Sequence, residues 1–174
     1  IPEDNVELKY ARNNNITVMK SAQFIAELMK KEKGIAISGT HGKTTTTAMV
    51  ASLLKQGGMD PSILLGGELE DIGNAYNGSG EYFVTEADES DGSLLYFNPE
   101  IVIVTNIELD HHDYYKNKEE LLTTFEKFIK KVPDTGKAIL CGEDNYLREF
   151  IKNNYLNVLT YGMEKGTVQA VDIN

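Results

Sequence analysis

The segment at residues 38–50, SGTHGKTTTTAMV, restricts the fold more than any other part of the chain. It joins the compact apolar run IAIS, at residues 35–38, to the helical pattern TTTTAMVASLLKQ through a short turn. Gly39 and Gly42 lack a Cβ atom, so the backbone of the turn can bend closely around a ligand. The start of the helix offers unpaired N–H groups to an anion. The segment therefore predicts a phosphate-binding loop between a buried parallel strand and a helix.

Lys43 and Thr44 are the loop residues expected to carry its chemistry. The ammonium of Lys43 would lie beside the β- and γ-phosphates of a nucleotide, and the Thr44 hydroxyl would be a ligand of Mg²⁺. The common form of this loop has a glycine where this chain has Ile37, so the loop is shorter than usual. A plain glycine-rich turn with a solvated lysine is the alternative. The predicted nucleotide contacts are Gly39, Thr40, His41, Gly42, Lys43, Thr44 and Thr45.

Strands and helices alternate along the chain, which predicts an α/β fold with a mostly parallel sheet flanked by helices. We expect a polar loop at residues 67–80 and a helix N-cap at Ser21. The expected helices cover residues 4–14, 21–33, 44–56, 116–131 and 145–154. The expected strands cover residues 16–19, 35–38, 62–66, 82–87, 101–107, 138–142 and 157–162, with one more in the tail at 166–174.

Charge and composition exclude several classes of partner. The formal net charge of −10 argues against a nucleic-acid surface and against an anionic membrane. The chain lacks an apolar run long enough to span a bilayer, and its single cysteine, Cys141, excludes an internal disulfide. The single cysteine predicts a protein of the reducing cytosol. As a separate expectation, which composition does not decide, the protein would be a monomer or a weak homo-oligomer.

Two further predicted strands end in clusters of polar residues, and the carboxyl ends of parallel strands meet at one edge of a sheet. Glu86, the first acid after its strand, is a candidate Mg²⁺ ligand, and His111 suits a second metal site. The alternatives are a solvated acidic turn at the first cluster and a helix N-terminus at the second. The clusters consist of Glu86, Asp88, Glu89 and Asp91, and of Asn106, Glu108, Asp110, His111, His112 and Asp113.

Three segments in this order and spacing, GTHGKTTTT, EADESDGS and TNIELDHHDYY, closely resemble the ATP-dependent Mur ligases. The short loop without the extra glycine is the form found in that family. The second and third segments resemble most the branch that adds L-alanine to UDP-N-acetylmuramate. A related branch, which recycles murein peptides, tends to differ at Ser90. The resemblance extends over nearly the whole chain, but the family usually has methionine where His112 stands, which we interpret as a packing difference.

The resemblance implies a reaction and its residues. ATP would phosphorylate the lactoyl carboxylate of UDP-N-acetylmuramate, and the amine of L-alanine would then attack the acyl phosphate, in peptidoglycan precursor synthesis in the bacterial cytoplasm. Lys43 would act on the γ-phosphate, with Mg²⁺ held by Thr44 and Glu86 and a second metal held by His111. Asn106 and Glu108 would support the site or contact substrate.

The resemblance also implies a domain division. Residues 1–19 would be the end of an N-terminal uridine-nucleotide-binding, Rossmann-like domain, and residues 20–174 an incomplete central ATP-binding domain, with the C-terminal domain absent. Two other interpretations stay open at this point. The chain would be a generic P-loop NTPase or kinase, or a fragment that binds nucleotide without turnover.

Overall fold

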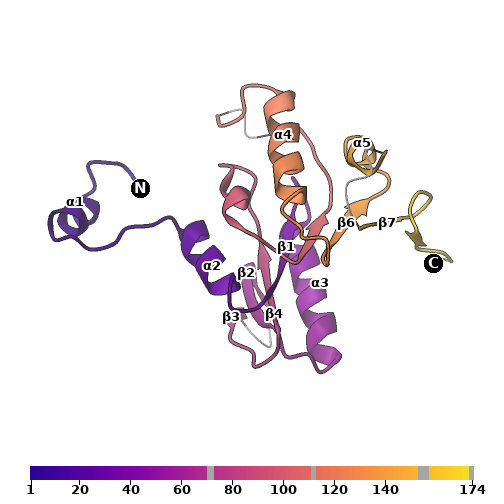
Figure 1. Cartoon of the computed structure of the whole chain (residues 1–174), viewed down its shortest axis with the longest axis horizontal. Coiled ribbons are helices and arrows are strands. Elements are labelled where there is room, and N and C mark those ends of the chain that lie inside the picture. The colour runs from indigo at the N-terminus through magenta and orange to yellow at the C-terminus, as the bar shows by residue number, and fades with distance from the viewer. Residues whose placement is uncertain (70–72, 111–112, 153–156, 173–174) are drawn as a thin grey trace.

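An eight-stranded sheet forms the centre of the computed structural model, which describes residues 1–69, 73–110, 113–152 and 157–172 (Figure 1). The strand order is β3-β2-β4-β1-β5-β6-β7-β8, and every neighbouring pair is parallel except β2 with β3. The predicted α/β fold with a mostly parallel sheet is confirmed. The strands are β1 (Lys33–Ser38), β2 (Ser62–Leu69), β3 (Gly73–Tyr76), β4 (Tyr82–Glu86), β5 (Ile101–Val104), β6 (Lys137–Cys141), β7 (Val158–Gly162) and β8 (Val168–Gln169).

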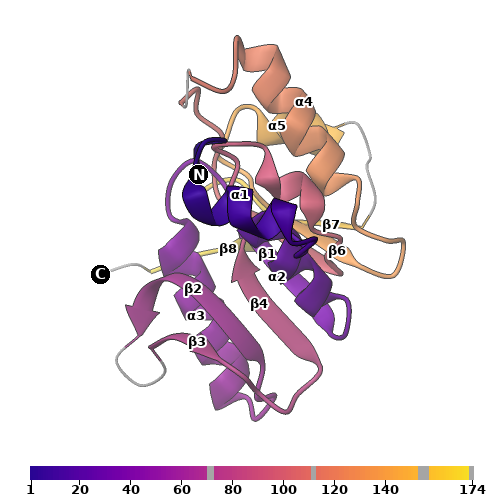
Figure 2. The ribbon, with the colours of Figure 1, turned by 90° about the vertical axis from the view of Figure 1, so that its left-hand side faces the viewer.

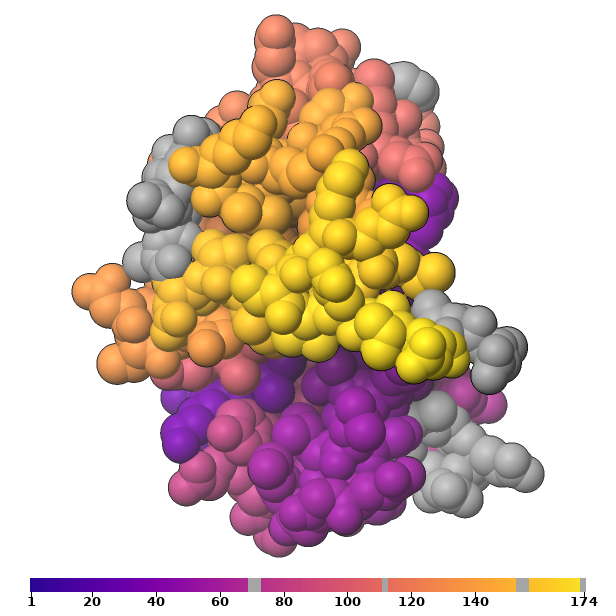
Figure 3. Space-filling view, turned by 90° about the vertical axis from the view of Figure 1, so that its right-hand side faces the viewer, coloured from indigo at the N-terminus to yellow at the C-terminus, as the bar shows by residue number. Residues whose placement is uncertain are grey.

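Helices cover both faces of this sheet. One face carries α3 (Lys43–Gln56), whose Val50 and Leu54 pack on buried residues of β1, β4 and β5. The other face carries α2 (Ser21–Met29), the 3₁₀ helix η1 (Ser93–Tyr96), α4 (Lys118–Ile129) and α5 (Leu147–Lys152). Figure 3 shows α3 in purple at the surface, beside the C-terminal segment in yellow. Among the described residues, none of the helices combines the length and apolarity needed to cross a bilayer.

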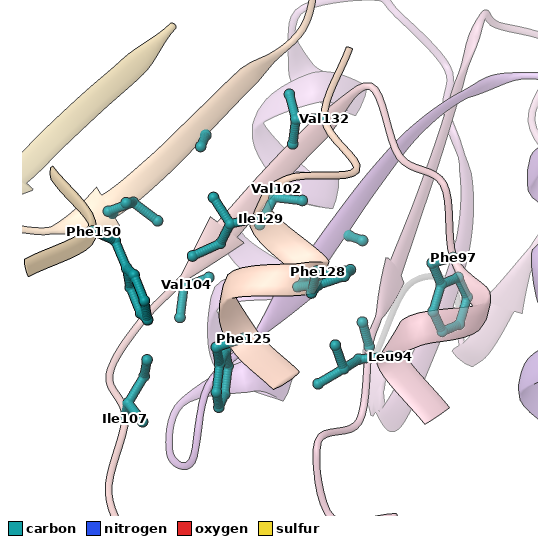
Figure 4. Close-up of a cluster of buried hydrophobic side chains, with 14 of the residues drawn as sticks. Leu94, Phe97, Val102, Val104, Ile107, Phe125, Phe128, Ile129, Val132 and Phe150 are labelled. Atoms are coloured by element: carbon teal, nitrogen blue, oxygen red, sulfur yellow. The ribbon is translucent and has the colours of Figure 1, made fainter. Parts of the chain in front are cut away.

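The larger part of the core lies under α4 (Figure 4). Phe125 and Phe128 come from one face of α4, are fully buried, and belong to the same core cluster as Val102 and Val104 of β5. The buried residues of α4 recur at intervals of three and four positions, which is the spacing of one face of a helix. This packing fixes α4 and η1 over the central strands, and η1 follows directly on the acidic turn after β4.

The helix α1 (Val6–Asn13) lies apart from this core and has no buried residue (Figures 1 and 2). The predicted strand at residues 16–19 is wrong, because this segment pairs with none of the described strands. Without hydrogen-bonding neighbours an apolar run has no reason to form a strand. The division at Lys20 stays a prediction.

Three other sequence predictions need correction. The predicted polar loop at residues 67–80 contains β3 and the end of β2, which pair antiparallel. The four residues of β3, GNAY, show no apolar pattern typical of a strand, and none of them is fully buried, because β3 lies at the edge of the sheet. The residue at the N-cap of α2 is Lys20, not Ser21. The strand predicted at 101–107 ends at Val104, because the chain then leaves the sheet to pack against the phosphate loop.

Candidate functional site

The three strands β4, β1 and β5 are neighbours in the middle of the sheet, and their carboxyl ends form the site. Ile37 of β1 is in register with Glu86 of β4, and Ser38 is in register with Val104 of β5. All three strands are parallel, so the segments that follow them leave the sheet at the same edge. The topology therefore brings together the loop at residues 39–42, the acidic turn after Glu86 and the segment after Val104.

The backbone of the loop adopts conformations that favour glycine. Gly39 has φ of 132° and Gly42 has φ of 82°. A Cβ atom on Gly39 would lie 2.2 Å from the Thr105 hydroxyl, whereas one on Gly42 would meet no atom within 4 Å. Gly42 is the N-cap of α3 and provides no side-chain cap, so the first turn of α3 keeps N–H groups for an anion.

The ammonium of Lys43 lies under this loop. Lys43 Nζ donates hydrogen bonds to the carbonyl oxygens of Gly39 at 2.7 Å and Thr40 at 3.3 Å. It also lies 3.0 Å from both carboxylate oxygens of Glu89. The Lys43 side chain is 18% exposed and that of Glu89 only 1%. The positive charge is thus held at the phosphate loop by a buried carboxylate.

Thr44 and Glu86 form a pair of oxygen donors at the start of α3. Thr44 Oγ1 donates to Glu86 Oε2 at 3.0 Å, and the Gly66 N–H donates to Glu86 Oε1 at 2.7 Å. A hydroxyl and a carboxylate beside a phosphate site are ligands that suit Mg²⁺, with phosphate oxygens and water completing the shell. The described residues contain no group of three or more His, Cys, Asp or Glu side chains that could hold a metal unaided. The donor set fits a Mg²⁺ ion that arrives with a nucleotide.

The segment after β5 clamps the loop from the other side. Asn106 Oδ1 accepts from the His41 N–H and Asn106 Nδ2 donates to the His41 carbonyl oxygen, both at 2.9 Å. Thr40 Oγ1 accepts from the Glu108 N–H at 2.8 Å. The side chains of His41 and Glu108 are exposed, with His41 Nε2 3.5 Å from Glu108 Oε2. Asn106 therefore fixes the shape of the loop through its backbone.

Asp144 holds this clamp in place from outside the site. Asp144 Oδ2 accepts from the Ile107 N–H at 3.0 Å, and its Oδ1 accepts from the N–H groups of Tyr146 and Leu147, each at 2.8 Å. These two N–H groups lie at the start of α5, one just before its first residue and one on it, so one carboxylate caps a helix and holds the segment that follows β5. The orientation of Asn106 depends in this way on β6 and α5.

The structure brings together most of the residues predicted for the site. The loop residues, Lys43, Thr44, Glu86, Asn106 and Glu108 lie at one edge of the sheet, while His111 and His112 lie outside the described residues. Sequence analysis did not foresee the roles of Glu89, Gly66 and Asp144. The signals were present in part: Glu89 belongs to the acidic cluster, and a diglycine at residues 66–67 inside a strand indicates close approach of another group.

The chain is similar in sequence to known proteins. The family model described as the Mur ligase middle domain matches residues 37–174. The UDP-N-acetylmuramate--L-alanine ligase of Pelotomaculum thermopropionicum is 52% identical over 165 residues, which are 94% of this chain and 36% of that protein. The chain spans a little over a third of the length of the curated relatives it matches, as the 38% share for the Clostridium acetobutylicum ligase also illustrates.

Solved structures give the same fold. The crystal structure of the UDP-N-acetylmuramate-alanine ligase MurC from Thermotoga maritima matches with a TM-score of 0.83 at 32% identity, over 96% of this chain and 38% of that one. A UDP-N-acetylmuramate:L-alanyl-gamma-D-glutamyl-meso-diaminopimelate ligase from Neisseria meningitides matches with a TM-score of 0.80 at 24% identity, over 92% of this chain and 56% of that one. The second similarity concerns the fold alone.

Proposed function

The chain belongs to the Mur ligase family, and from this premise we propose that it is the ATP-binding part of a ligase that joins L-alanine to UDP-N-acetylmuramate. The observation that carries the proposal is the contact of Thr44 with Glu86 at the mouth of the phosphate loop, beside Lys43. The similarity to named L-alanine ligases supports the choice of substrates.

The chemistry requires positive charge, because a carboxylate must attack a phosphate that is itself anionic. Lys43 would move its ammonium to the β- and γ-phosphates, and the N–H groups at the start of α3 would bind the same oxygens. Asn106 keeps the loop in shape while the phosphates bind. These groups would stabilise charge that develops on the γ-phosphate and orient it toward the acceptor carboxylate.

Thr44 and Glu86 would hold Mg²⁺, with Gly66 fixing the Glu86 carboxylate through its N–H. When bound, Mg²⁺ would supply further positive charge at the phosphate oxygens. The assignment of His111 to a second metal stays a prediction, because this residue lies outside the described part of the chain. His41 belongs to the loop, and its exposed side chain is available to contact nucleotide or substrate.

The reaction would proceed in two stages. The lactoyl carboxylate of UDP-N-acetylmuramate attacks the γ-phosphorus of ATP and displaces ADP, which leaves an acyl phosphate. The amine of L-alanine attacks its carbonyl carbon, and inorganic phosphate leaves with one oxygen of the original carboxylate. We place this reaction in the bacterial cytoplasm, in a complete protein that has the N-terminal and C-terminal domains in addition to residues 20–174. The 174-residue chain by itself would bind nucleotide weakly and would not turn over.

Substrate-dependent phosphate release tests this proposal. The full-length protein is incubated with Mg²⁺, ATP, UDP-N-acetylmuramate and single amino acids, and inorganic phosphate is measured. We expect release that requires both the sugar nucleotide and L-alanine. Release without either would identify a generic P-loop NTPase, and release that requires a murein tripeptide in place of L-alanine would identify the recycling ligase.

A further inference from the structure

Glu89 has a buried carboxylate, and burying a charged group costs free energy. Its side chain is 1% exposed, and both of its oxygens lie 3.0 Å from Lys43 Nζ. A carboxylate loses several kcal/mol of hydration when it is buried, and a buried ion pair stabilises a protein little compared with apolar residues of the same size. Stability alone does not account for a carboxylate at this position.

The ammonium of Lys43 has no proton left for a phosphate in this state. An ammonium carries three N–H donors. Those of Lys43 are directed at the Gly39 carbonyl, the Thr40 carbonyl and Glu89. Lys43 must therefore give up at least one of these acceptors before it can contact a nucleotide.

Two hydrogen bonds hold the main chain at Glu89 in place, whereas the Lys43 side chain is flexible. The carbonyl oxygen of Glu89 accepts hydrogen bonds from the buried Tyr115 hydroxyl at 2.5 Å and from the Gly92 N–H at 3.0 Å. Burial raises the pKa of Tyr115 to about 12, so the Tyr115 hydroxyl keeps its proton and remains a donor at neutral pH. Lys43 instead has a flexible four-carbon stem. When phosphates enter, the Lys43 side chain would move, while the two hydrogen bonds would hold the main chain at Glu89 in place.

We propose that Glu89 is a positioning residue that competes with the nucleotide for the ammonium of Lys43 and so limits how tightly the loop binds phosphates. A phosphate oxygen that contacts Lys43 also comes close to the Glu89 carboxylate and is repelled by it. The competition keeps Lys43 in place in the empty loop and favours release of ADP after the reaction. The inference rests on the proposed function of the loop as a nucleotide site.

The test is the affinity of the full-length protein for Mg-ADP, measured by calorimetry for the wild type and for Glu89→Gln. We expect Glu89→Gln to lower the Kd by about tenfold or more, because one negative charge is removed from a poorly hydrated position beside the phosphates. Asp88→Asn is the matched control. It removes the same charge from the same turn, but the exposed Asp88 side chain accepts from Ser90, and we expect less than a twofold change.

Measuring Glu89→Gln in the Lys43→Met variant shows whether its effect on the Kd for Mg-ADP depends on Lys43. In Lys43→Met protein the Glu89→Gln substitution should change the Kd less than in wild type, because the competition for the ammonium is gone and only the direct repulsion between the Glu89 carboxylate and the phosphates remains. A purely structural role for Glu89 would instead weaken binding in both backgrounds. Unchanged or weaker binding by Glu89→Gln in the wild-type background would overturn the proposal.

The same experiment also distinguishes two other outcomes: misfolding of Glu89→Gln and absence of nucleotide binding by the wild type. Should Glu89→Gln fail to fold by circular dichroism, Glu89→Asp keeps the charge but withdraws it by one methylene group, and it should bind Mg-ADP several-fold more tightly than wild type. Binding by Glu89→Asp no tighter than by wild type overturns the inference. No binding of Mg-ADP or Mg-ATP by the wild type would refute the proposed function of the loop instead.

Discussion

Replacing Lys43 by methionine should lower both the free energy of unfolding and the rate of turnover, and the two effects can be measured separately. Methionine keeps the length of the side chain and removes its charge. The Glu89 carboxylate, whose side chain is 1% exposed, then loses its ammonium partner. Removing one member of a buried ion pair costs about 3–5 kcal/mol, because the remaining charge stays buried. The Lys43 side chain is only 18% exposed, so solvent screens this pair weakly.

The expected loss corresponds to a decrease of about 6–20 °C in Tm, at roughly 2–4 °C per kcal/mol for a domain of this size. The double variant Lys43→Met/Glu89→Gln should recover most of it, since the amide carries no charge. The free energy of unfolding is measured by denaturant titration of the 174-residue chain, with Lys55→Met as the control for loss of an exposed lysine.

Turnover should not recover in the double variant. Without the ammonium, phosphoryl transfer by the full-length ligase should be slower by at least about 10²- to 10³-fold, since a positive charge at the transferring phosphate is missing. A stability loss below about 1 kcal/mol in Lys43→Met, or no recovery in the double variant, would refute the idea that Lys43 neutralises a buried carboxylate. Substantial turnover without Lys43 would refute its role at the phosphates.

Three other predictions concern Glu86, Gly66 and Glu143. Glu86→Gln should weaken Mg²⁺-dependent nucleotide binding by about tenfold or more, which titration of ATP affinity against Mg²⁺ concentration would detect. Gly66→Ala should have a similar but smaller effect with little change in Tm, because its Cβ would lie 3.1 and 3.2 Å from the Glu86 oxygens; an unchanged Mg²⁺ dependence would argue against this contact. Backbone N–H groups of Lys165, Glu164 and Met163 lower the pKa of Glu143 from 4.5 to about 2, so its stabilising contribution is complete above pH 4.5 and is lost as pH falls toward 2. The Tm difference between wild type and Glu143→Gln should shrink over that interval, and a difference that stays constant would contradict the assignment.

The sequence was sufficient for the parts of the site that depend on chain order. A buried strand, a glycine turn and a helix in succession fix the place of Lys43 and Thr44, whatever the rest of the protein does. Glu86 follows from the same logic, because it ends a strand that the alternating pattern makes parallel to β1. The convergence of these residues needs only strand order and direction.

Contacts that depend on the path of a turn could not be predicted. Three acids follow β4, and nothing in their spacing shows that Glu89 turns inward while Asp88 faces solvent. That choice depends on the left-handed conformation of Gly92 and on Tyr115, which approaches from a segment 26 residues away. Asp144 is a similar case, since it caps its own helix and reaches Ile107 only because β5 and β6 are neighbours.

The strands that were missed or misplaced have a related cause. The segment at residues 16–19 is apolar enough for a strand but has no partner among the described strands, whereas β3 forms because it pairs with the edge of β2 that faces away from β4. Hydrogen-bonding partners, and not local composition, decide these two segments.

The most direct test of the account follows one oxygen atom. UDP-N-acetylmuramate labelled with ¹⁸O in both oxygens of its lactoyl carboxylate is incubated with ATP, Mg²⁺, L-alanine and the full-length protein. The inorganic phosphate released is then analysed by mass spectrometry. If Lys43 and the Thr44–Glu86 pair direct the γ-phosphate to that carboxylate, each phosphate released should carry one ¹⁸O atom. Phosphate without the label would mean that water receives the phosphoryl group, and the proposed reaction would be wrong.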